Sequence, residues 1–323
     1  MEYSSRIDLT EFNSKIAELK FAVNSIVKGQ DEVLELLLTA LLADGHVLLE
    51  GVPGVAKTLM AKTLSQLIGV DFKRLQFTPD LMPTDVVGTS ILNTQTQEFT
   101  FRKGPVFTQF LLVDEINRAP AKTQAALFEC MEERQVTFDG KTYALPDFYM
   151  VMATQNPVEF LGTYPLPEAQ MDRFLMRISI GYPSEADEAD ILERYSMPTQ
   201  PMHQVAPVCT AQDIINLQQQ VKTVYCSREV RAYIVSLCAA TRKVSTLTLG
   251  ASTRAAIALC HAAQANALLS GRDYIIPEDV QHLYMHVLAH RLVPSAEARM
   301  ANLTSEQILA GIMKQVRIPV KMR

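Results

Sequence analysis

A short segment containing two glycines, a lysine and a threonine has the residue types needed to hold a phosphate group. It follows the apolar run at residues 47–49 and consists of Gly51, Val52, Pro53, Gly54, Val55, Ala56, Lys57 and Thr58. Glycines let the backbone approach an anion closely, so successive N–H groups and a helix N-terminus can face it. Lys57 would reach the outer phosphates of a nucleotide, and the Thr58 hydroxyl would complete a magnesium site. The segment therefore predicts a phosphate-binding loop between a buried strand and a helix starting near Thr58.

One position of this loop departs from the usual spacing. Ala56 occupies the place before the lysine, where a glycine normally stands. An alanine is acceptable there when its backbone is already helical, because the Cβ is then not in the way. We therefore expect helical dihedral angles at Ala56.

Two adjacent carboxylates follow a second apolar run, at residues 110–113. They are Asp114 and Glu115, and they lie 56 positions beyond Thr58. Asp114 would hold a magnesium ion, directly or through water, and Glu115 would polarise a water for attack on the terminal phosphate. The alternative is that both carboxylates cap a helix expected at residues 120–133. Because the pair follows a strand in a chain that also has a phosphate loop, we favour nucleotide hydrolysis.

A single asparagine, Asn156, ends another apolar strand, expected at residues 149–154. Its chemistry suits a turn before Pro157, which is the simpler structural explanation. It could also orient the attacking water between the acidic pair and the terminal phosphate. With two nucleotide motifs upstream, we favour the functional role.

Two arginines could supply the positive charge that phosphoryl transfer needs beyond a lysine and magnesium. Arg173 precedes the last expected strand, and Arg254 starts a helix expected at residues 252–269. An arginine offers a fixed fork of donors to a phosphate. The structural alternatives are an ion pair of Arg173 with Asp172 or Glu168, and a solvated helix position for Arg254. Spacing alone does not decide which arginine supplies the charge.

The composition is that of an ordinary globular protein. The chain has 323 residues, of which 48% are hydrophobic and 20% charged, enough for two domains or one large one. Its net charge is −5 and its pI is about 5.7. This balance disfavours binding to nucleic acids or anionic membranes through overall charge, while leaving room for a local basic channel.

Several features favour a cytoplasmic location. The apolar segment at residues 33–43 is too short to span a bilayer and contains Glu35. Residues 1–15 lack the apolar core of a secretory signal. The five cysteines are scattered without a C-x-x-C pair, which is typical of reduced cytosolic thiols.

The periodicity predicts an α/β domain followed by a helical one. Strands are expected at residues 47–50, 72–76, 111–113, 149–154 and 175–180, separated by helical patterns, which indicates a parallel sheet covered on both faces. An N-terminal helical region spans residues 12–43, with an interruption at 27–30. Helical patterns then dominate at residues 184–195, 211–222, 227–243, 252–269, 277–290 and 304–314. We expect Ser227 and Ser252 to be N-caps. We predict a nucleotide-binding core at residues 1–183 and a linker helix with a helical lid at 184–323, residues 197–207 being the best linker candidate.

Two hairpins are expected within the α/β part. Residues 91–101 place apolar residues at both ends of a polar centre. Residues 136–143 contain an Asp-Gly turn between two strand-like arms, which is a stronger hairpin signal. On a nucleotide-hydrolysing core, such insertions suggest working loops.

Together these motifs resemble the MoxR family of AAA+ ATPases along essentially the whole chain. The resemblance rests on five separated blocks in the right order: residues 51–58 with their Ala-Lys-Thr ending, 104–120, 153–157, 165–174 and 250–254. Ala56 is itself usual in that family. The resemblance implies an αβα AAA+ core with a P-loop and a parallel sheet, followed by an all-helical lid, with ATP and Mg²⁺ between them.

The resemblance also implies individual residue roles. Asn156 would be the sensor-1 residue, Arg254 the sensor-2 residue of the lid, and Arg173 an arginine finger acting on ATP held by a neighbouring subunit. Val27 and Gly29 match the segment that contacts adenine. The hairpin at 91–101 matches the helix-2 insert, and that at 136–143 matches the hairpin before sensor 1.

The expected function is that of an oligomeric ATPase that remodels or matures a client protein complex. MoxR proteins resemble chaperones of metal-dependent enzymes, commonly act with von Willebrand factor A domain proteins, and would form a homo-oligomer, as a hexameric ring. One alternative is a nucleic-acid-stimulated motor, because relatives with a helix-2 insert act on DNA. The acidic pI and the lack of a basic, aromatic-interleaved stretch argue against it. Another alternative is a nucleotide-gated binding module with negligible turnover, which the intact Lys57, Asp114, Glu115 and Asn156 disfavour.

Overall fold

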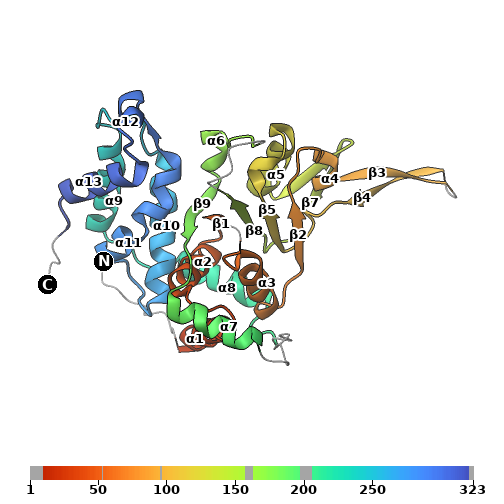
Figure 1. The fold of residues 1–323 in the computed structure, drawn as a ribbon, viewed down its shortest axis with the longest axis horizontal. Coiled ribbons are helices and arrows are strands. Elements are labelled where there is room, and N and C mark those ends of the chain that lie inside the picture. Colours follow the sequence, from red (N-terminus) through yellow and green to blue (C-terminus); the bar gives the residue numbers. More distant parts are fainter. Residues whose placement is uncertain (1–9, 53, 95–96, 157–162, 197–205, 320–323) are drawn as a thin grey trace.

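The fold is built around a five-stranded parallel sheet (Figure 1). The computed structural model describes residues 10–52, 54–94, 97–156, 163–196 and 206–319. The strand order is β2-β5-β8-β1-β9. The strands are β1 His46–Gly51, β2 Phe72–Gln76, β5 Phe110–Asp114, β8 Met150–Gln155 and β9 Phe174–Ile180. All five expected strands are confirmed, as is their parallel pairing.

Alternating residues of the central strands face two separate apolar clusters, which explains why these strands are apolar throughout. Val47 and Leu49 of β1 pack with helices α2 Asp31–Leu42 and α3 Lys57–Leu67. Helix α1 Thr10–Asn24 contributes to the same apolar cluster. Leu48 faces the opposite cluster, together with helix α5 Ala121–Glu133. The expected break in the N-terminal helical region lies between α1 and α2, as predicted.

The chain beyond the sheet is mainly helical. Its helices are α7 Glu185–Ser196, α8 Ala211–Val221, α9 Arg228–Thr241, α10 Thr253–Leu269, α11 Pro277–Leu288, α12 Ala296–Met300 and α13 Ser305–Gln315. The expected N-caps are confirmed, because the Ser227 hydroxyl accepts from Val230 N and the Ser252 hydroxyl from Ala255 N. Helix α12 and the antiparallel pair β10 Leu247–Leu249 and β11 Val293–Pro294 were not expected, since such short elements leave no periodic pattern. No helix in the described ranges has the length and apolar character to cross a membrane.

The helical part packs directly against the α/β part. Residues of α10 and α11 belong to the same apolar cluster as β1 and α2. Gln218 of α8 donates from Nε2 to the backbone oxygen of Leu41 at 2.8 Å. In Figure 1 the helices α9 to α13 lie beside the β9 edge of the sheet, while α7 and α8 lie near α1, α2 and α3. The predicted linker falls largely on residues 197–205, outside the described residues.

Both predicted hairpins are confirmed. The first pairs β3 Gly88–Asn93 with β4 Glu98–Lys103, after the short helix α4 Pro83–Val87. The second pairs β6 Gln135–Phe138 with β7 Lys141–Ala144. The β3–β4 hairpin extends well away from the body of the molecule (Figure 1).

Candidate nucleotide site

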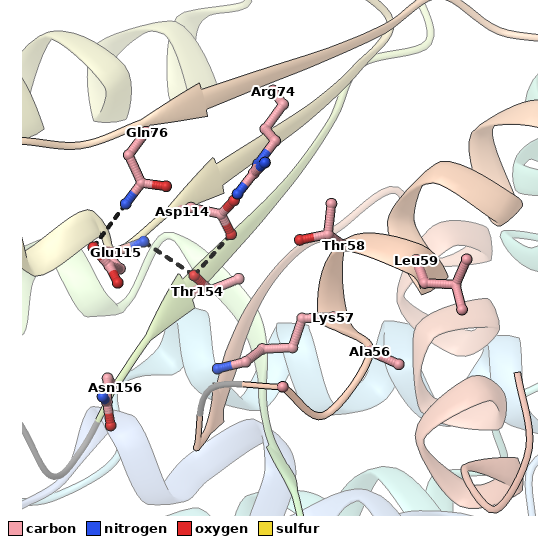
Figure 2. Close-up of a pocket in the computed structure, with 11 residues that line it drawn as sticks. Ala56, Lys57, Thr58, Leu59, Arg74, Gln76, Asp114, Glu115, Thr154 and Asn156 are labelled. Atoms are coloured by element: carbon pink, nitrogen blue, oxygen red, sulfur yellow. Dashed lines mark hydrogen bonds and ion pairs between the residues drawn. The ribbon is translucent and has the colours of Figure 1, made fainter. Parts of the chain in front are cut away.

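A polar cavity of about 330 Å³ lies at the carboxyl ends of β1, β5 and β8 (Figure 2). Carboxyl ends of parallel strands meet at one edge of a sheet, which is where α/β folds place ligands. The residues lining this cavity are Gly54, Ala56, Lys57, Thr58, Leu59, Arg74, Gln76, Asp114, Glu115, Thr154 and Asn156. The structure thus brings together the lysine, threonine, acidic pair and asparagine singled out in the sequence.

The predicted phosphate loop runs from the end of β1 into α3, which begins at Lys57, one residue before the expected start. Gly51 has no room for a side chain, since a Cβ there would lie 2.6 Å from the backbone oxygen of Ile180. Gly54 has a φ of 90°, which favours glycine. Val52 and Val55 pack against the core, and Pro53 lies outside the described residues. The loop backbone is therefore shaped by its two glycines.

The Lys57 side chain lies within the loop, with Nζ donating to the Gly51 oxygen at 2.6 Å. Burial lowers the pKa of Lys57, while the carboxylates of Asp114, Glu115 and Glu50 act in the opposite direction. Thr58 lies on the neighbouring part of the cavity wall (Figure 2). A cation and a hydroxyl thus face the acidic pair across one cavity.

The backbone of Ala56 differs from the expectation. Its φ of 59° and ψ of 19° place it in the left-handed region, so the helical dihedral angles expected there are wrong. Ala56 is the N-cap of α3, where the chain reverses out of the loop, and the usual glycine would adopt this conformation without strain. The sequence could not show this because the angle depends on how the loop closes.

Thr154, at the end of β8, connects the two carboxylate residues. Its hydroxyl donates to Asp114 Oδ1 at 3.2 Å and accepts from the Glu115 backbone N–H at 3.0 Å. Asp114 Oδ2 also accepts from Arg74 Nε at 2.6 Å. The Asp114 carboxylate is buried and held on both oxygens.

Glu115 has a φ of 55°, which turns its side chain out of the strand direction. Its Oε2 accepts from Gln76 Nε2 at 2.7 Å and lies 3.1 Å from Arg118 Nε. Helix α5 has Pro120 as its N-cap and no side-chain cap bond. The alternative that the acidic pair caps this helix is therefore wrong.

Three polar residues of the cavity, Arg74, Gln76 and Thr154, and the apolar Leu59 were not identified from the sequence. Arg74 and Gln76 are two positions apart on β2, so they share one face of the strand. Gln76 pairs in register with Asp114 on the neighbouring strand. The signal that could have identified Arg74 and Gln76 is the alternation of polar residues along β2, the strand that pairs with the Asp114 strand β5.

A second cavity, of about 370 Å³, adjoins the first and shares Gly54, Ala56 and Leu59 with it. It is also lined by Ile26, Val27, Lys28, Gln30, Val55, Pro183 and Ile191. Val27, which matches the adenine-contacting segment of the family, therefore lines this second cavity. Gly29 has a φ of 68° between two lining residues, and a Cβ there would lie 2.7 Å from Asp187 Oδ2. A mainly apolar cavity beside a polar one matches the two ends of a nucleotide.

Arg173 and Arg254 are absent from the described residues that line either cavity. Both lie against Glu132 of α5: Arg173 Nη2 is 2.7 Å from it and Arg254 Nη1 is 3.1 Å from it. Arg173 therefore pairs with Glu132 and not with Asp172 or Glu168, the two partners considered from the sequence, because α5 packs beside the start of β9. Arg254 contacts Glu132 and Asp172, so the alternative of a purely solvated helix position is wrong.

Comparisons with known proteins agree with this geometry. The family model for the ATPase family associated with various cellular activities (AAA) matches residues 46–176. The model for the AAA lid domain matches residues 239–312. The first range contains the phosphate loop, the acidic pair, Asn156 and Arg173, and the second contains Arg254.

Relatives match nearly the whole chain. Uncharacterized protein YeaC of Bacillus subtilis is 49% identical over 93% of this chain and 93% of its own length. Chaperone MoxR1 of Mycobacterium tuberculosis is 44% identical over 93% of this chain and 81% of its own. Protein MoxR of Methylorubrum extorquens is 31% identical, over 94% and 95%.

A solved structure shows the same architecture. The crystal structure of a proposed ATPase from Cytophaga hutchinsonii superposes with a TM-score of 0.89 at 41% identity, covering 96% of each chain. The family of this chain follows from its phosphate loop, the acidic pair beside the loop and the helical lid. It follows also from the relatives, which match more than nine-tenths of the chain. The chain belongs to the MoxR family of AAA+ ATPases.

Proposed function

We propose that this protein is a cytoplasmic, oligomeric ATPase that uses ATP hydrolysis to remodel or mature a client protein complex, including metal-dependent enzymes. The observation that carries the proposal is that Lys57, Thr58, Asp114 and Glu115 surround one cavity. The second, more apolar cavity extends from it and has the character needed for an adenine ring. ATP has a triphosphate that suits the polar cavity and an adenine ring that suits the more apolar one.

The donor set fits a magnesium ion bound with ATP. The Thr58 hydroxyl and the Asp114 carboxylate are oxygen ligands of the kind Mg²⁺ prefers. Mg²⁺ bound there would neutralise charge on the transferring phosphoryl group. Lys57 would bind the outer phosphates, and the backbone around Gly54 would enclose them.

Glu115 is the group proposed to take a proton from the attacking water. Its carboxylate is oriented by Gln76 and Arg118, which keeps it at the cavity wall. Asn156 lines the same cavity and would orient the water. Water positioned between these two side chains could attack the terminal phosphate in line with its leaving group.

Assembly into a homo-oligomer, as a hexameric ring, is part of the proposal, and the positions of Arg173 and Arg254 support a site shared between neighbouring subunits. Both arginines lie outside the described lining of this chain's own cavities. A phosphoryl group in transfer needs more positive charge than one lysine and one metal ion supply. Arginines presented at the surface of one subunit would supply it to ATP bound by the next.

A protein client and a von Willebrand factor A domain partner complete the proposal. A relative named Chaperone MoxR1 supports the chaperone role. The β3–β4 hairpin supports a protein contact, since it extends away from the body of the molecule (Figure 1) and exposes Leu92 and Phe99 on one face. Large apolar side chains exposed together are typical of protein-binding surfaces.

The test uses two substitutions in the cavity. Glu115→Gln should keep ATP binding but lose at least about a hundredfold in turnover, because an amide does not accept the proton. Lys57→Ala should weaken binding itself, because the phosphates lose their nearest side-chain cation. Binding is measured with a fluorescent ATP analogue and turnover by phosphate release. Parental turnover in Glu115→Gln would overturn the assignment, and stimulation by DNA or RNA at physiological salt would favour a nucleic-acid motor.

A further inference from the structure

Five charged residues from the core and the lid meet at one end of α5. They are Glu132 of α5, Asp172 and Arg173 before β9, Arg254 in the first turn of α10, and Arg291 of the 3-10 helix η2 Ala289–Arg291. In Figure 1 the short helix α6 Glu168–Met171, which precedes Asp172, lies between α5 and the lid helices. Three arginines against two carboxylates leave the cluster with an excess of one positive charge. Neither nucleotide cavity, as far as its described lining shows, includes any of the five.

Glu132 contacts both arginines that the sequence singled out. Its Oε2 lies 2.7 Å from Arg173 Nη2, and its Oε1 accepts from Arg254 Nη1 at 3.1 Å. Burial acts to raise the pKa of Glu132, but Arg173 and Arg254 outweigh it and hold that pKa below its usual range. One carboxylate thus uses a different oxygen for each guanidinium group.

The remaining contacts anchor this arrangement to the fold. Asp172 lies 3.8 Å from Arg254 Nε and 3.1 Å from Arg291 Nη1. Arg291 is almost completely buried, with 3% of its side chain exposed, and donates from Nη2 to the Phe174 oxygen at 2.8 Å. Arg173 donates to the Ala169 oxygen at 3.2 Å, and its guanidinium lies 5.9 Å from the centre of the Phe128 ring.

The arginines differ in what they can do. Arg291 is enclosed and serves the fold, whereas 54% of the Arg254 side chain and 26% of the Arg173 side chain are exposed. Two guanidinium groups this close repel each other unless a carboxylate lies between them. With Glu132 between them, they can face one external anion together while the cluster keeps its positive excess.

We propose that Glu132 is a positioning residue that holds Arg173 and Arg254 as one cationic unit for the terminal phosphate of ATP bound to a neighbouring copy of this chain. The inference rests on the proposed function, because it needs ATP in the adjacent subunit. Glu132 itself does not touch the phosphate. It joins the start of β9 in the core to the first turn of α10 in the lid, so lid position and arginine position are set together.

Subunit mixing tests this inference. Glu132→Gln removes the charge but keeps the shape, so turnover should fall at least about tenfold, as for a misplaced arginine finger. ATP affinity should stay within about twofold, because the chain's own cavity is untouched. Glu133→Gln, the same change on the next and exposed residue, is the matched control and should keep parental turnover.

The defect should be complemented from the other side of the subunit interface. Mixing Glu132→Gln with Lys57→Ala should restore part of the activity, since some interfaces then pair an intact loop with an intact arginine unit. Mixing Glu132→Gln with Arg173→Ala should restore none, since both lack that unit. A general folding defect would not follow this pattern.

Mixing Arg173→Ala with Lys57→Ala gives a reference pair. It separates the role of Glu132 from the hypothesis that neighbouring subunits share the ATP site. If Arg173→Ala with Lys57→Ala recovers activity but Glu132→Gln with Lys57→Ala does not, the role of Glu132 is overturned and the shared site stands. If the reference pair fails in mixed oligomers shown to form, the shared site itself is wrong. If Glu132→Gln folds poorly, Glu132→Asp is used in its place. Its effect on turnover is then compared between the parent and an Arg254→Ala background. The Asp substitution should lower turnover much less in that background than in the parent, whereas equal losses in both backgrounds would refute the coupling.

Discussion

Two non-glycine residues of the nucleotide site have left-handed backbone angles, and they differ in what holds them there. Glu115, with a φ of 55°, is fixed by its backbone bond to Thr154 and by side-chain contacts to Gln76 and Arg118. Ala56, with a φ of 59°, has no polar side chain to compensate. A left-handed conformation costs an L-residue about 1–2 kcal/mol. At Glu115 this strain aims a carboxylate, whereas at Ala56 it only closes the loop.

At Ala56 the strain can be relieved by substitution. Ala56→Gly should raise the free energy of unfolding by about 0.5–1 kcal/mol, because glycine adopts a positive φ freely. Ala61→Gly, in the interior of the following helix α3, should instead lower it by about 1 kcal/mol or more. Denaturant unfolding of nucleotide-free protein measures both. Equal destabilisation by the two substitutions would contradict the account of Ala56.

At the scale of elements, a buried histidine ties the sheet to α5. His46 of β1 lies with Nε2 3.2 Å from the Met131 oxygen, and its Nδ1 accepts from the Val151 N–H of β8 at 3.0 Å. This pattern suits a neutral ring with its proton on Nε2. Burial and the nearby Arg134 lower the pKa of His46 to about 4, although the Met131 contact opposes them.

This histidine should make stability depend on pH. The folded-state pKa is below the unfolded value of about 6.5, so the unfolded chain binds more protons and stability falls from about pH 6.5 down to about pH 4. Between pH 7.5 and pH 5 the loss due to His46 is about 2 kcal/mol. Denaturant unfolding at both pH values should show a change smaller by that amount in His46→Gln. An identical pH dependence in variant and parent would mean that folding does not lower the pKa of His46.

The β3–β4 hairpin has one apolar face that is covered at its base and uncovered towards its tip. Leu92 pairs with Phe99, and Phe101 lies two residues further along the same face. Phe101 stacks on Phe138 and Tyr143 of the second hairpin, with ring centroids 5.1 and 4.5 Å away. Phe99, by contrast, is 71% exposed and Leu92 47% exposed. The base is therefore structural, and the outer part is available to a partner.

We expect the partner contact at this outer face as well as at the tip, residues 93–97. Leu92→Ser with Phe99→Ser should leave basal ATP hydrolysis near the parental rate but abolish its stimulation by the partner, because the exposed apolar surface is lost. Ile91→Ser changes the opposite face of the same strand and should retain stimulation. The measurement is the ATPase rate with and without a von Willebrand factor A domain protein, the class of partner proposed above. If stimulation survives the double substitution, the second hairpin becomes the better site.

For the whole molecule, the main consequence of the fold is that core and lid are joined near the nucleotide. Arg177 of β9 lies 3.6 Å from Glu50, the residue before the phosphate loop, and also forms an ion pair with Glu306 of α13. Burial raises the pKa of Glu50, which Arg177 counteracts. With the Glu132 cluster and the Lys15–Asp213 ion pair between α1 and α8, Arg177 connects the lid to the core through charged side chains. Lid movement would therefore affect both the loop and the arginines.

Assembly should control activity. If a neighbour supplies Arg173, specific ATPase activity should rise with protein concentration, because isolated subunits lack the second half of each site. Activity per subunit is measured across a dilution series together with mass by light scattering. Arg173→Ala should bind ATP normally and stay slow at every concentration. A monomer that hydrolyses ATP as fast per subunit as the oligomer would refute the shared site.

Much of the architecture could be predicted from the sequence alone, because it depends on short-range patterns. Apolar runs and helical periodicity predicted the five strands, the principal helices and both hairpins, and serine caps predicted where α9 and α10 begin. Elements of two to five residues, such as β10, β11 and α12, were missed because they have too few residues to show a period. The phosphate loop and the acidic pair were recognised because their chemistry lies within contiguous residues.

The tertiary structure decided every feature that depends on a partner distant in the chain. Arg74 and Gln76 became part of the nucleotide site only because β2 pairs with β5, and the left-handed angle of Ala56 follows from the closure of the loop. Glu132 lies 41 positions before Arg173 and 122 before Arg254, so no local pattern relates the three. The sequence by itself determined which residues can do chemistry. Folding determined which of them meet, because charged groups are brought within contact distance by the packing of the elements that carry them.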